Sequence, residues 1–263
     1  MRIALCQITS TASPSENLAL IRSEVAAAAA AGASVALFPE ATMACFGTSL
    51  RGLAEPLDGP WASEVASIAA SHDVLVVAGM FTPAADGRVF NTLLATGRGH
   101  HVGYDKIHLF DAFGFAESRT VAPGSSLVTV DVDGVTLGLA TCYDVRFPAV
   151  FTGLADRGAT AVLLPASWGA GPGKREQWEL LVRARALDST CWVLACGQAD
   201  PVASGLPVHP SAPTGIGFST VADPGGGVHA ALEAAPGQLV VDIDLSLVEK
   251  TRQNIPVLAN RRL

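Results

Sequence analysis

Gly138-Leu-Ala-Thr-Cys-Tyr-Asp-Val-Arg-Phe-Pro148 carries an apolar strand that ends directly at a cysteine, Cys142. Two other segments also end in a reactive side chain: Leu37-Phe-Pro-Glu40 ends in a carboxylate, and Tyr104-Asp-Lys-Ile-His-Leu109 supplies the ammonium of Lys106. Enzymes of layered α/β construction keep their chemistry where buried elements stop. We therefore predict a layered α/β enzyme whose chemistry is carried by these three side chains.

Helix and strand patterns alternate in the first part of the chain. Residues 3–8 are a predicted strand, and Ser13-Pro14-Ser15-Glu16 then supplies a helix N-cap, a proline at the first helical position and a glutamate at the third. The alanine-rich helix that follows ends at Gly32. The next expected elements are a buried strand over residues 34–38, a helix near residues 61–71 and a strand over residues 74–80.

Period-two hydrophobic patterns in the middle of the chain predict hairpins rather than crossovers. One hairpin joins residues 90–96 to 101–105, and another joins residues 127–132 to 135–141 through Asp133-Gly134. The remaining expected elements are a helix after Cys142 that ends at about Gly158, strands over 161–164, 191–196 and 239–243, a helix over 174–188, a hairpin turning at Asp223-Pro-Gly-Gly226 and a terminal helix.

Mixed βαβ units and hairpins imply two sheets with helices outside them, because each sheet needs one face against a core and the other face covered. The chain has 263 residues, of which 49% are hydrophobic, so it can bury a large core. Layered α/β folds of this length often form one domain. We therefore predict a single domain over residues 1–263.

Charge and composition narrow the range of partners and compartments. A net charge of −7 and a pI near 5.3 argue against a nucleic-acid or anionic-membrane surface, so a small-molecule substrate is expected. The first residues turn polar too early for a secretory segment, and no apolar stretch is long enough for a bilayer. Five cysteines without a Cys-x-x-Cys pair are typical of free thiols in a reducing cytosol, and we predict a cytoplasmic protein.

The order of glutamate, lysine and cysteine in these motifs closely resembles the nitrilase superfamily of carbon–nitrogen hydrolases. The run Cys142-Tyr-Asp-Val-Arg-Phe-Pro148, followed by Gly171-Pro-Gly and Trp178-Glu-Leu-Leu-Val-Arg-Ala-Arg-Ala186, is most similar to the Nit branch of small stand-alone amidases. The resemblance extends from Ile3-Ala-Leu-Cys-Gln7 to Arg261-Arg-Leu263. It implies a four-layer α-β-β-α sandwich with two mixed sheets, and a homodimer.

Amide hydrolysis needs a nucleophile, a base, a group that stabilises the oxyanion and an acid for the departing ammonia. The resemblance assigns Cys142 as the nucleophile that forms a thioester and Glu40 as the general base. Lys106 and the backbone N–H of Tyr143 would form the oxyanion hole. Glu117 matches the position of a second family glutamate and would orient Lys106. We expect Lys106 and the following helix N-terminus to favour the Cys142 thiolate.

Each of these residues also has a simpler interpretation. Glu40, as a glutamate after a strand, would more often be a surface or helix-capping residue. Glu117 would be a surface carboxylate in a loop. Lys106 is also typical of a charge on an edge strand that prevents aggregation. A Cys142–His108 dyad is the main mechanistic rival. The histidines His100, His101 and His108 are not spaced to bind one ion, so we predict neither a metal nor a cofactor. Four further cysteines are expected to be inert and buried: Cys6, Cys45, Cys191 and Cys196.

Substrate specificity has weaker signals. Arg146 either pairs with a substrate carboxylate or bridges structural carboxylates such as Asp144. Ser167 and Trp168 are expected in the pocket wall, although Trp168 would also suit a subunit contact. The chain departs from the Nit pattern at three positions: Asp105, where a basic residue is frequent, and Gln177 and Phe218, where histidine is frequent.

Together these features predict a thiol-dependent amidase that hydrolyses the terminal carboxamide of a small, carboxylate-bearing metabolite and releases ammonia. By resemblance, the leading substrates are ω-amides of 2-oxo acids, such as 2-oxoglutaramate, or deaminated glutathione. The alternatives are an N-carbamoyl amino acid hydrolase, a true nitrilase, or a catalytically silent binding or scaffold protein of the same fold.

The C-terminal stretch over residues 245–263 is apolar and basic, with no obvious core of its own chain left to join. A twofold contact would bury it on both copies, and we predict that it lies in a homodimer interface. The alternative is that it folds back over its own sheet.

Overall fold

A computed structural model describes residues 1–112, 114–209 and 212–262. One mixed sheet has the strand order β15 (Gly237–Asp242), β1 (Arg2–Gln7), β2 (Val35–Leu37), β3 (Leu75–Pro83), β4 (Val89–Gly97) and β5 (His100–Asp105), with β8 (Val121–Ala122) paired to β4. The second sheet has the order β14 (Val228–Ala231), β13 (Thr220–Ala222), β12 (Trp192–Gly197), β11 (Ala161–Ala166), β10 (Val135–Leu139) and β9 (Thr129–Val132).

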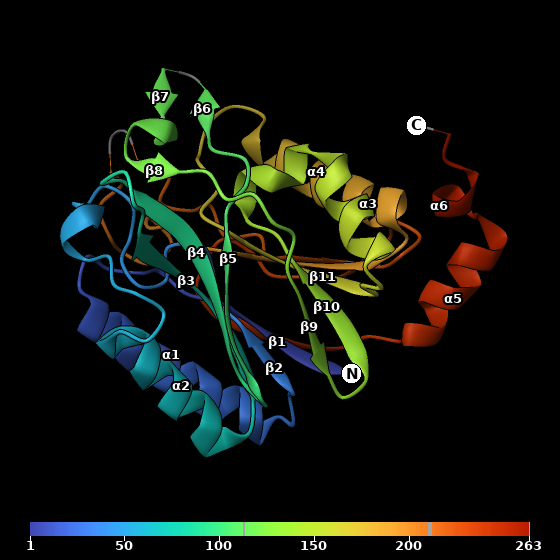
Figure 1. The fold of residues 1–263 in the computed structure, drawn as a ribbon, viewed down its shortest axis with the longest axis horizontal. Coiled ribbons are helices and arrows are strands. Elements are labelled where there is room, and N and C mark those ends of the chain that lie inside the picture. Colours follow the sequence, from blue (N-terminus) through green and yellow to red (C-terminus); the bar gives the residue numbers. More distant parts are fainter. Residues whose placement is uncertain (113, 210–211, 263) are drawn as a thin grey trace.

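Helices cover the outer face of each sheet, as Figure 1 shows. The first sheet is covered by α1 (Pro14–Ala30) and α2 (Pro60–His72), and the second by α3 (Pro148–Asp156) and α4 (Lys174–Ser189). The C-terminal helices are α5 (Leu245–Asn254) and α6 (Val257–Asn260). This arrangement confirms the predicted four-layer α-β-β-α fold.

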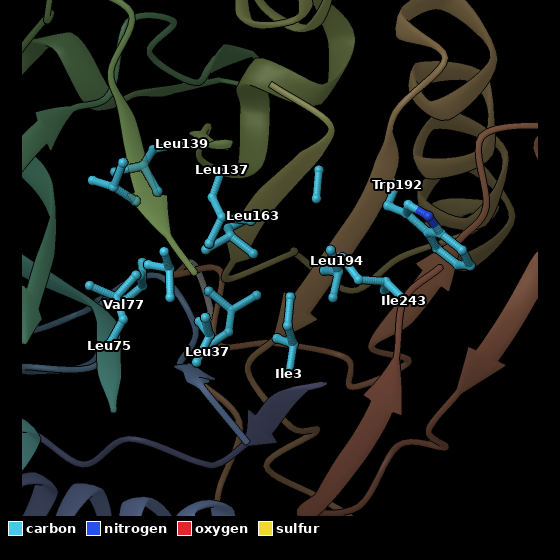
Figure 2. Close-up of a cluster of buried hydrophobic side chains, with 14 of the residues drawn as sticks. Ile3, Leu37, Leu75, Val77, Leu137, Leu139, Leu163, Trp192, Leu194 and Ile243 are labelled. Carbon is cyan, nitrogen blue, oxygen red and sulfur yellow. The ribbon is translucent and has the colours of Figure 1, made fainter. Parts of the chain in front are cut away.

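The core lies between the two sheets. Leu37 and Val77 from the first sheet face Leu137, Leu163 and Leu194 from the second (Figure 2), and all five side chains are fully buried. Fully burying one such side chain stabilises the fold by about 1.5–3 kcal/mol. This core holds the two sheets together and so fixes the relative positions of the strand ends.

The local signals at the start of α1 act as predicted. The Ser13 side chain accepts a hydrogen bond from the Glu16 N–H, and Pro14 occupies the first turn. The hairpins are also confirmed, with β4 antiparallel to β5 and β9 antiparallel to β10.

The helix predicted after Cys142 is present as α3, but it does not follow the cysteine directly. A 3-10 turn, η3 (Cys142–Arg146), is followed by extended backbone at Phe147 before α3 begins at Pro148. The proline ring disfavours helical backbone at the residue before it, and this breaks the chain there. Besides η3, the short elements that were not predicted are β6 (Asp111–Ala112), β7 (Phe115–Ala116), β8, η1 (Leu50–Gly52) and η2 (Glu117–Arg119).

The expectation that the C-terminal stretch has no core of its own to join is wrong. Val248 is 2% exposed in the core between the sheets, and Leu245 and Leu247 pack beside it. Arg252 donates to the Ala159 carbonyl at 3.0 Å. The segment therefore folds back over its own chain, and its last residue, Leu263, lies outside the described residues. In the parts that the structure describes, no helix has the length and apolarity to cross a membrane.

Candidate active site

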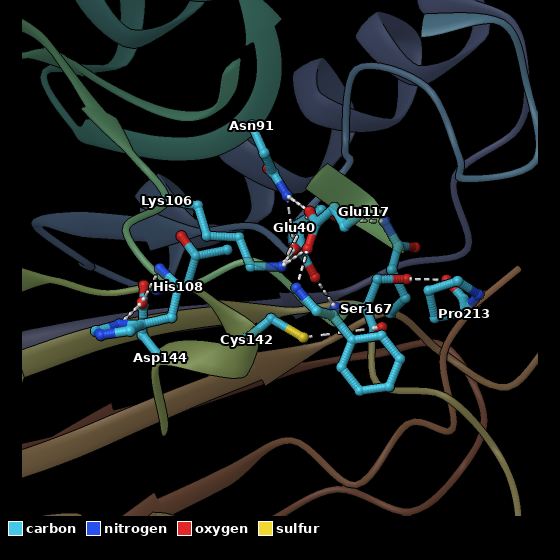
Figure 3. Close-up of polar contacts among 12 residues, drawn as sticks. Glu40, Asn91, Lys106, His108, Glu117, Cys142, Asp144, Ser167 and Pro213 are labelled. Atoms are coloured by element: carbon cyan, nitrogen blue, oxygen red, sulfur yellow. Dashed lines mark hydrogen bonds and ion pairs between the residues drawn. The ribbon is translucent and has the colours of Figure 1, made fainter. Parts of the chain in front are cut away.

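Three strand ends bring the predicted reactive side chains together. Glu40 follows β2 and Lys106 follows β5 in the first sheet, whereas Cys142 follows β10 in the second. The Lys106 Nζ lies 3.0 Å from the Glu40 Oε1, and Cys142 lies beside this pair (Figure 3). All three residues are buried: Glu40 is 0% exposed, Lys106 2% and Cys142 9%. The edge-strand interpretation of Lys106 is therefore wrong.

Glu117 completes the charged cluster from the short turn η2. Its Oε2 lies 2.9 Å from the Lys106 Nζ and also accepts the Phe110 backbone N–H at 2.7 Å. Its exposure of 4% contradicts the surface interpretation. One ammonium thus lies between two carboxylates, and Glu117 holds the Lys106 side chain in place.

The Glu40 carboxylate is held from several directions. Its Oε2 accepts the Ser167 N–H at 2.7 Å, and its backbone carbonyl accepts the side-chain amide of Gln198 at 3.0 Å. Strand β3 passes directly behind it at Gly79, where an added Cβ would lie 2.4 Å from the Ala41 nitrogen. Any larger residue at this position would displace the backbone that carries Glu40.

Cys142 has a backbone conformation that is rare for residues other than glycine. Its φ of 44° is in the left-handed region, at the transition from β10 to the 3-10 turn. Such conformations are strained and occur often at functional sites. The bend directs the thiol toward the cluster, where the Sγ lies 4.0 Å from the Ser167 carbonyl oxygen.

The electrostatics of the cluster differ from the prediction for the thiol. Burial raises the pKa of Cys142 well above its usual value, and the charge of Glu40 raises it further, whereas Lys106 acts in the opposite direction. Burial alone would lower the pKa of Lys106, but Glu117 and Glu40 outweigh it and raise that pKa well above its usual value. Lys106 thus favours the thiolate as expected, but burial and the charge of Glu40 outweigh it. The raised pKa favours the protonated thiol at this position.

The cluster lies in a cavity of about 50 Å³ whose other walls are mostly apolar. Besides the four charged or reactive side chains, the lining residues are Phe46, Phe110, Phe115, Tyr143, Ser167, Trp168, Gly169, Lys174 and Pro213. A second cavity of about 520 Å³ adjoins it, since both are lined by Phe46, Phe115 and Glu117. The first cavity has room for a small acyl group, and a longer substrate would extend into the second.

Tyr143, Ser167 and Trp168 line the cavity as the sequence indicates. The Ser167 hydroxyl donates to the Pro213 carbonyl at 2.6 Å, and its N–H is used by Glu40, so Ser167 shapes the wall. Trp168 is 5% exposed and its Nε1 donates to the Lys174 carbonyl at 2.8 Å. The interpretation of Trp168 as a subunit contact is therefore wrong.

Two cations lie at one end of this cavity. Arg146 donates to the Gln177 Oε1 at 2.7 Å and lies over the Trp168 ring, behind the cavity wall rather than in it. Lys174 lines the cavity, and burial and the charge of Arg146 lower its pKa. The sequence analysis did not single out Lys174. A lysine in the first turn of a helix opposes the helix dipole, and this was the available signal.

Asp144 and His108 form a separate structural pair. The His108 Nδ1 lies 2.8 Å from the Asp144 Oδ1, and its ring stacks on Phe147 with centroids 3.6 Å apart. Tyr104 donates to the other Asp144 oxygen at 2.6 Å. These contacts contradict both the pairing of Asp144 with Arg146 and the Cys142–His108 dyad, since the imidazole faces Asp144.

No metal-binding group of three or more His, Cys, Asp or Glu residues occurs among the described residues. His100 lies 2.7 Å from the Asp131 carbonyl oxygen, and His101 lies 2.7 Å from that of Leu57. The expected absence of a metal and of a cofactor stays a prediction from the sequence.

Asn91, on β4, is a cluster member that the sequence analysis missed. Its Nδ2 donates to the Glu40 Oε1 at 2.8 Å and to the Glu117 Oε1 at 3.2 Å. The available signal was a buried polar residue within an apolar strand, where asparagine is uncommon.

A family model described as carbon-nitrogen hydrolase matches residues 2–253. The chain belongs to the carbon–nitrogen hydrolase family. It is therefore a hydrolase acting on carbon–nitrogen bonds other than peptide bonds, and the resemblance to the Nit branch of the nitrilase superfamily is confirmed. The alternative of a silent scaffold has no support in the site, because the glutamate, lysine and cysteine of the family motifs are all present.

Relatives of known name cover nearly the whole chain. Hydrolase Rv0480c of Mycobacterium tuberculosis is 54% identical over 99% of this chain and 95% of its own length. The deaminated glutathione amidase of Escherichia coli O157:H7 is 32% identical over 100% of this chain and 97% of its own length. Mouse omega-amidase NIT2 is 32% identical over 99% and 95%.

Solved structures show the same fold. Saccharomyces cerevisiae Nit3, a member of branch 10 of the nitrilase superfamily, superposes with a TM-score of 0.86 at 24% identity, over 100% of this chain and 97% of its own. A variant of the amidase from Nesterenkonia sp. AN1 superposes with a TM-score of 0.82 at 26% identity, over 100% and 94%. That structure shows covalent addition of the acetamide moiety of fluoroacetamide at the active site cysteine.

Proposed function

We propose that this hydrolase is an amidase that cleaves the terminal carboxamide of a small, carboxylate-bearing metabolite through a thioester on Cys142. The observation that carries this proposal is the placement of the Lys106 ammonium between two carboxylates, beside a thiol, in one small cavity. The names of the relatives, a deaminated glutathione amidase and an omega-amidase, support the same reaction class.

In the acylation step, Glu40 takes the proton from the Cys142 thiol as the sulfur attacks the carbonyl carbon. The oxygen becomes negative and is stabilised by Lys106 and the backbone N–H of Tyr143. Lys106 contacts both oxygens of Glu117, at 3.2 and 2.9 Å, so one of its N–H groups can turn to the oxyanion while both carboxylates keep a partner. The carbon–nitrogen bond then breaks, and ammonia leaves with the proton from Glu40.

Deacylation reverses the roles. Glu40, now a carboxylate again, takes a proton from water as the water oxygen attacks the thioester carbonyl. The carbon–sulfur bond breaks, the acid is released, and the sulfur regains its proton from Glu40. The same carboxylate thus acts as base and acid in both steps.

The two cations at one end of the cavity favour a substrate with a carboxylate. Lys174 lies in the wall and Arg146 directly behind it, while no other lining residue besides the catalytic Lys106 is cationic in the part of the cavity that the structure describes. An ω-amide of a 2-oxo acid is the smaller of the two leading substrates, and deaminated glutathione would extend further into the adjoining cavity.

An ammonia-release assay over amides tests this function. We expect a 2-oxo acid ω-amide to be hydrolysed with a kcat/KM about ten- to a hundredfold above that of a neutral primary amide of equal length, as a charged hydrogen bond is worth this much. Lys174→Met should raise KM for the acidic amide alone, whereas Lys250→Met, on the exposed side of α5, should change nothing. A metal chelator should have no effect.

Three outcomes of that assay would contradict the proposal. Turnover of N-carbamoyl amino acids or nitriles without turnover of amides would favour the alternative chemistry. Equal turnover of neutral and acidic amides would remove the role of the two cations, and inactivation by chelator that zinc reverses would replace the metal-free mechanism.

We also propose a homodimer, now on a different surface from the C-terminal stretch. Leu180 and Leu187 lie two turns apart on the outer helix α4 and are 65% and 46% exposed. Exposed apolar side chains on one helix face are typical of a twofold contact. In sedimentation experiments we expect a dimer for the intact protein and a folded monomer for the Leu180→Asp, Leu187→Asp double variant. Val202→Asp is the matched control, and a monomeric intact protein would refute the dimer.

A further inference from the structure

Asn91 contacts both carboxylates of the cluster. The amide is 1% exposed, and its Nδ2 donates to the same two oxygens, Glu40 Oε1 and Glu117 Oε1, that the Lys106 Nζ contacts at 3.0 and 3.2 Å. Two donors, one charged and one neutral, thus bridge the same pair of acceptors (Figure 3).

The orientation of this amide is set by the carboxylates. If the amide were turned over, its carbonyl oxygen would face two negative oxygens and both hydrogen bonds would become repulsive contacts. In the present orientation the Asn91 Oδ1 is buried without a hydrogen-bond partner among the described residues. A buried acceptor without a partner destabilises the fold, so nothing on the Oδ1 side accounts for an asparagine at this position. The two hydrogen bonds that the amide nitrogen donates do account for it.

We propose that Asn91 is a positioning residue that keeps the carboxylates of Glu40 and Glu117 in one ionised arrangement around Lys106. Hydrogen bonds to a carboxylate favour its charged form, which is the form a base needs. Because Asn91 also contacts both carboxylates, Lys106 does not have to hold them in place alone. Lys106 can then turn one N–H toward the substrate without releasing either carboxylate.

The backbone of Asn91 has a separate role, which allows the side chain to be tested alone. Its carbonyl accepts the Lys106 N–H at 2.9 Å, and this bond joins the end of β5 to β4. A substitution at residue 91 leaves that bond in place. It removes only the two bonds from the amide nitrogen.

The test is the pH dependence of Cys142 alkylation by iodoacetamide, followed by mass spectrometry of the peptide that contains Cys142. Other titratable or charged groups face the carboxylate pair: Lys106, the Cys142 thiol and, across the cavity, Lys174. We expect Asn91→Leu, which keeps a similar volume, to move the acidic limb of the alkylation profile upward by roughly one pH unit. The direction follows because the charged form of the pair loses a donor.

Two further variants separate positioning from folding. Asn91→Asp places a third acidic group against the pair and should move the limb further upward than leucine does. Asn17→Leu removes a buried asparagine whose Nδ2 donates to the carbonyls of Thr11 and Met43, and it should lower stability without moving the limb. If Asn91→Leu does not fold, Asn91→Ser, which cannot span both acids, is expected to show the same shift.

A folded residue-91 variant with an unchanged limb, or an Asn17→Leu variant with the same shift, would overturn the proposal. Because it deepens the amidase mechanism proposed above, the readout does not require an amide substrate. A wild-type protein that is alkylated at Cys142 but hydrolyses no amide would refute the proposed function and leave the role of Asn91 to be judged from the alkylation profiles.

Discussion

Cys142→Ala is expected to abolish amide hydrolysis, with a loss of roughly 10⁴-fold or more, the size found when a covalent nucleophile is removed. Without the sulfur no thioester forms, and Glu40 has no thiol to deprotonate. The fold should persist, since alanine removes only the sulfur, whose contact with the Ser167 carbonyl oxygen is long at 4.0 Å. Ammonia release and thermal unfolding, measured on the same preparation, check both parts.

Cys196→Ala is the matched control for this prediction. Cys196 is fully buried and its Sγ donates to the Leu37 carbonyl at 3.2 Å, so this thiol faces backbone rather than the Glu40 and Lys106 pair. We expect it to lose some stability and to keep its activity. An inactive Cys196→Ala together with an active Cys142→Ala would contradict the assignment of the nucleophile.

Glu40→Gln is expected to slow acylation by about 10²- to 10⁴-fold, the usual contribution of a general base. Burial keeps the Cys142 thiol protonated at neutral pH, and a neutral amide cannot take its proton. Glutamine also removes the charge that raises the pKa of the thiol, so the residual rate should increase with pH as thiolate forms. Single-turnover measurements of thioester formation over a range of pH check this result.

Glu64→Gln, at an exposed ion pair with Arg22, is the control for the chemical change from glutamate to glutamine. It should acylate at the normal rate. A Glu40→Gln variant that also acylates at the normal rate would remove the base role and would leave Glu117 as the remaining carboxylate of the cluster.

The three side chains of the cluster were predictable because each follows a short strand, apolar before Glu40 and Cys142 and mixed before Lys106. Glu40, Lys106 and Cys142 stand where β2, β5 and β10 end, and a strand end is a local property. Two sheets with helices outside them followed from the sequence patterns, because hairpins and crossovers have distinct periods and turns, whereas the four-layer sandwich came from the family resemblance. The break at Phe147 also had a local signal in Pro148, which the helix prediction overlooked.

Asn91 was not predictable in this way. Its partners Glu40 and Glu117 are 51 and 26 positions away in sequence, so its role exists only once β4 lies beside β5 in the folded chain. The raised pKa of the Cys142 thiol was not predictable either, because its direction depends on a balance between burial, Glu40 and Lys106 in the folded chain. The prediction that the C-terminal stretch has no core to join failed for the same reason, because the surface that Val248 covers is formed by both sheets.

Thioester formation at Cys142 is the central claim, and rapid quenching of the enzyme with a 2-oxo acid ω-amide, followed by mass spectrometry, tests it most directly. We predict that ammonia release is accompanied by an acyl group on the peptide that contains Cys142, and on no other peptide. Turnover of the amide with Cys142 unmodified at every time point would contradict the account.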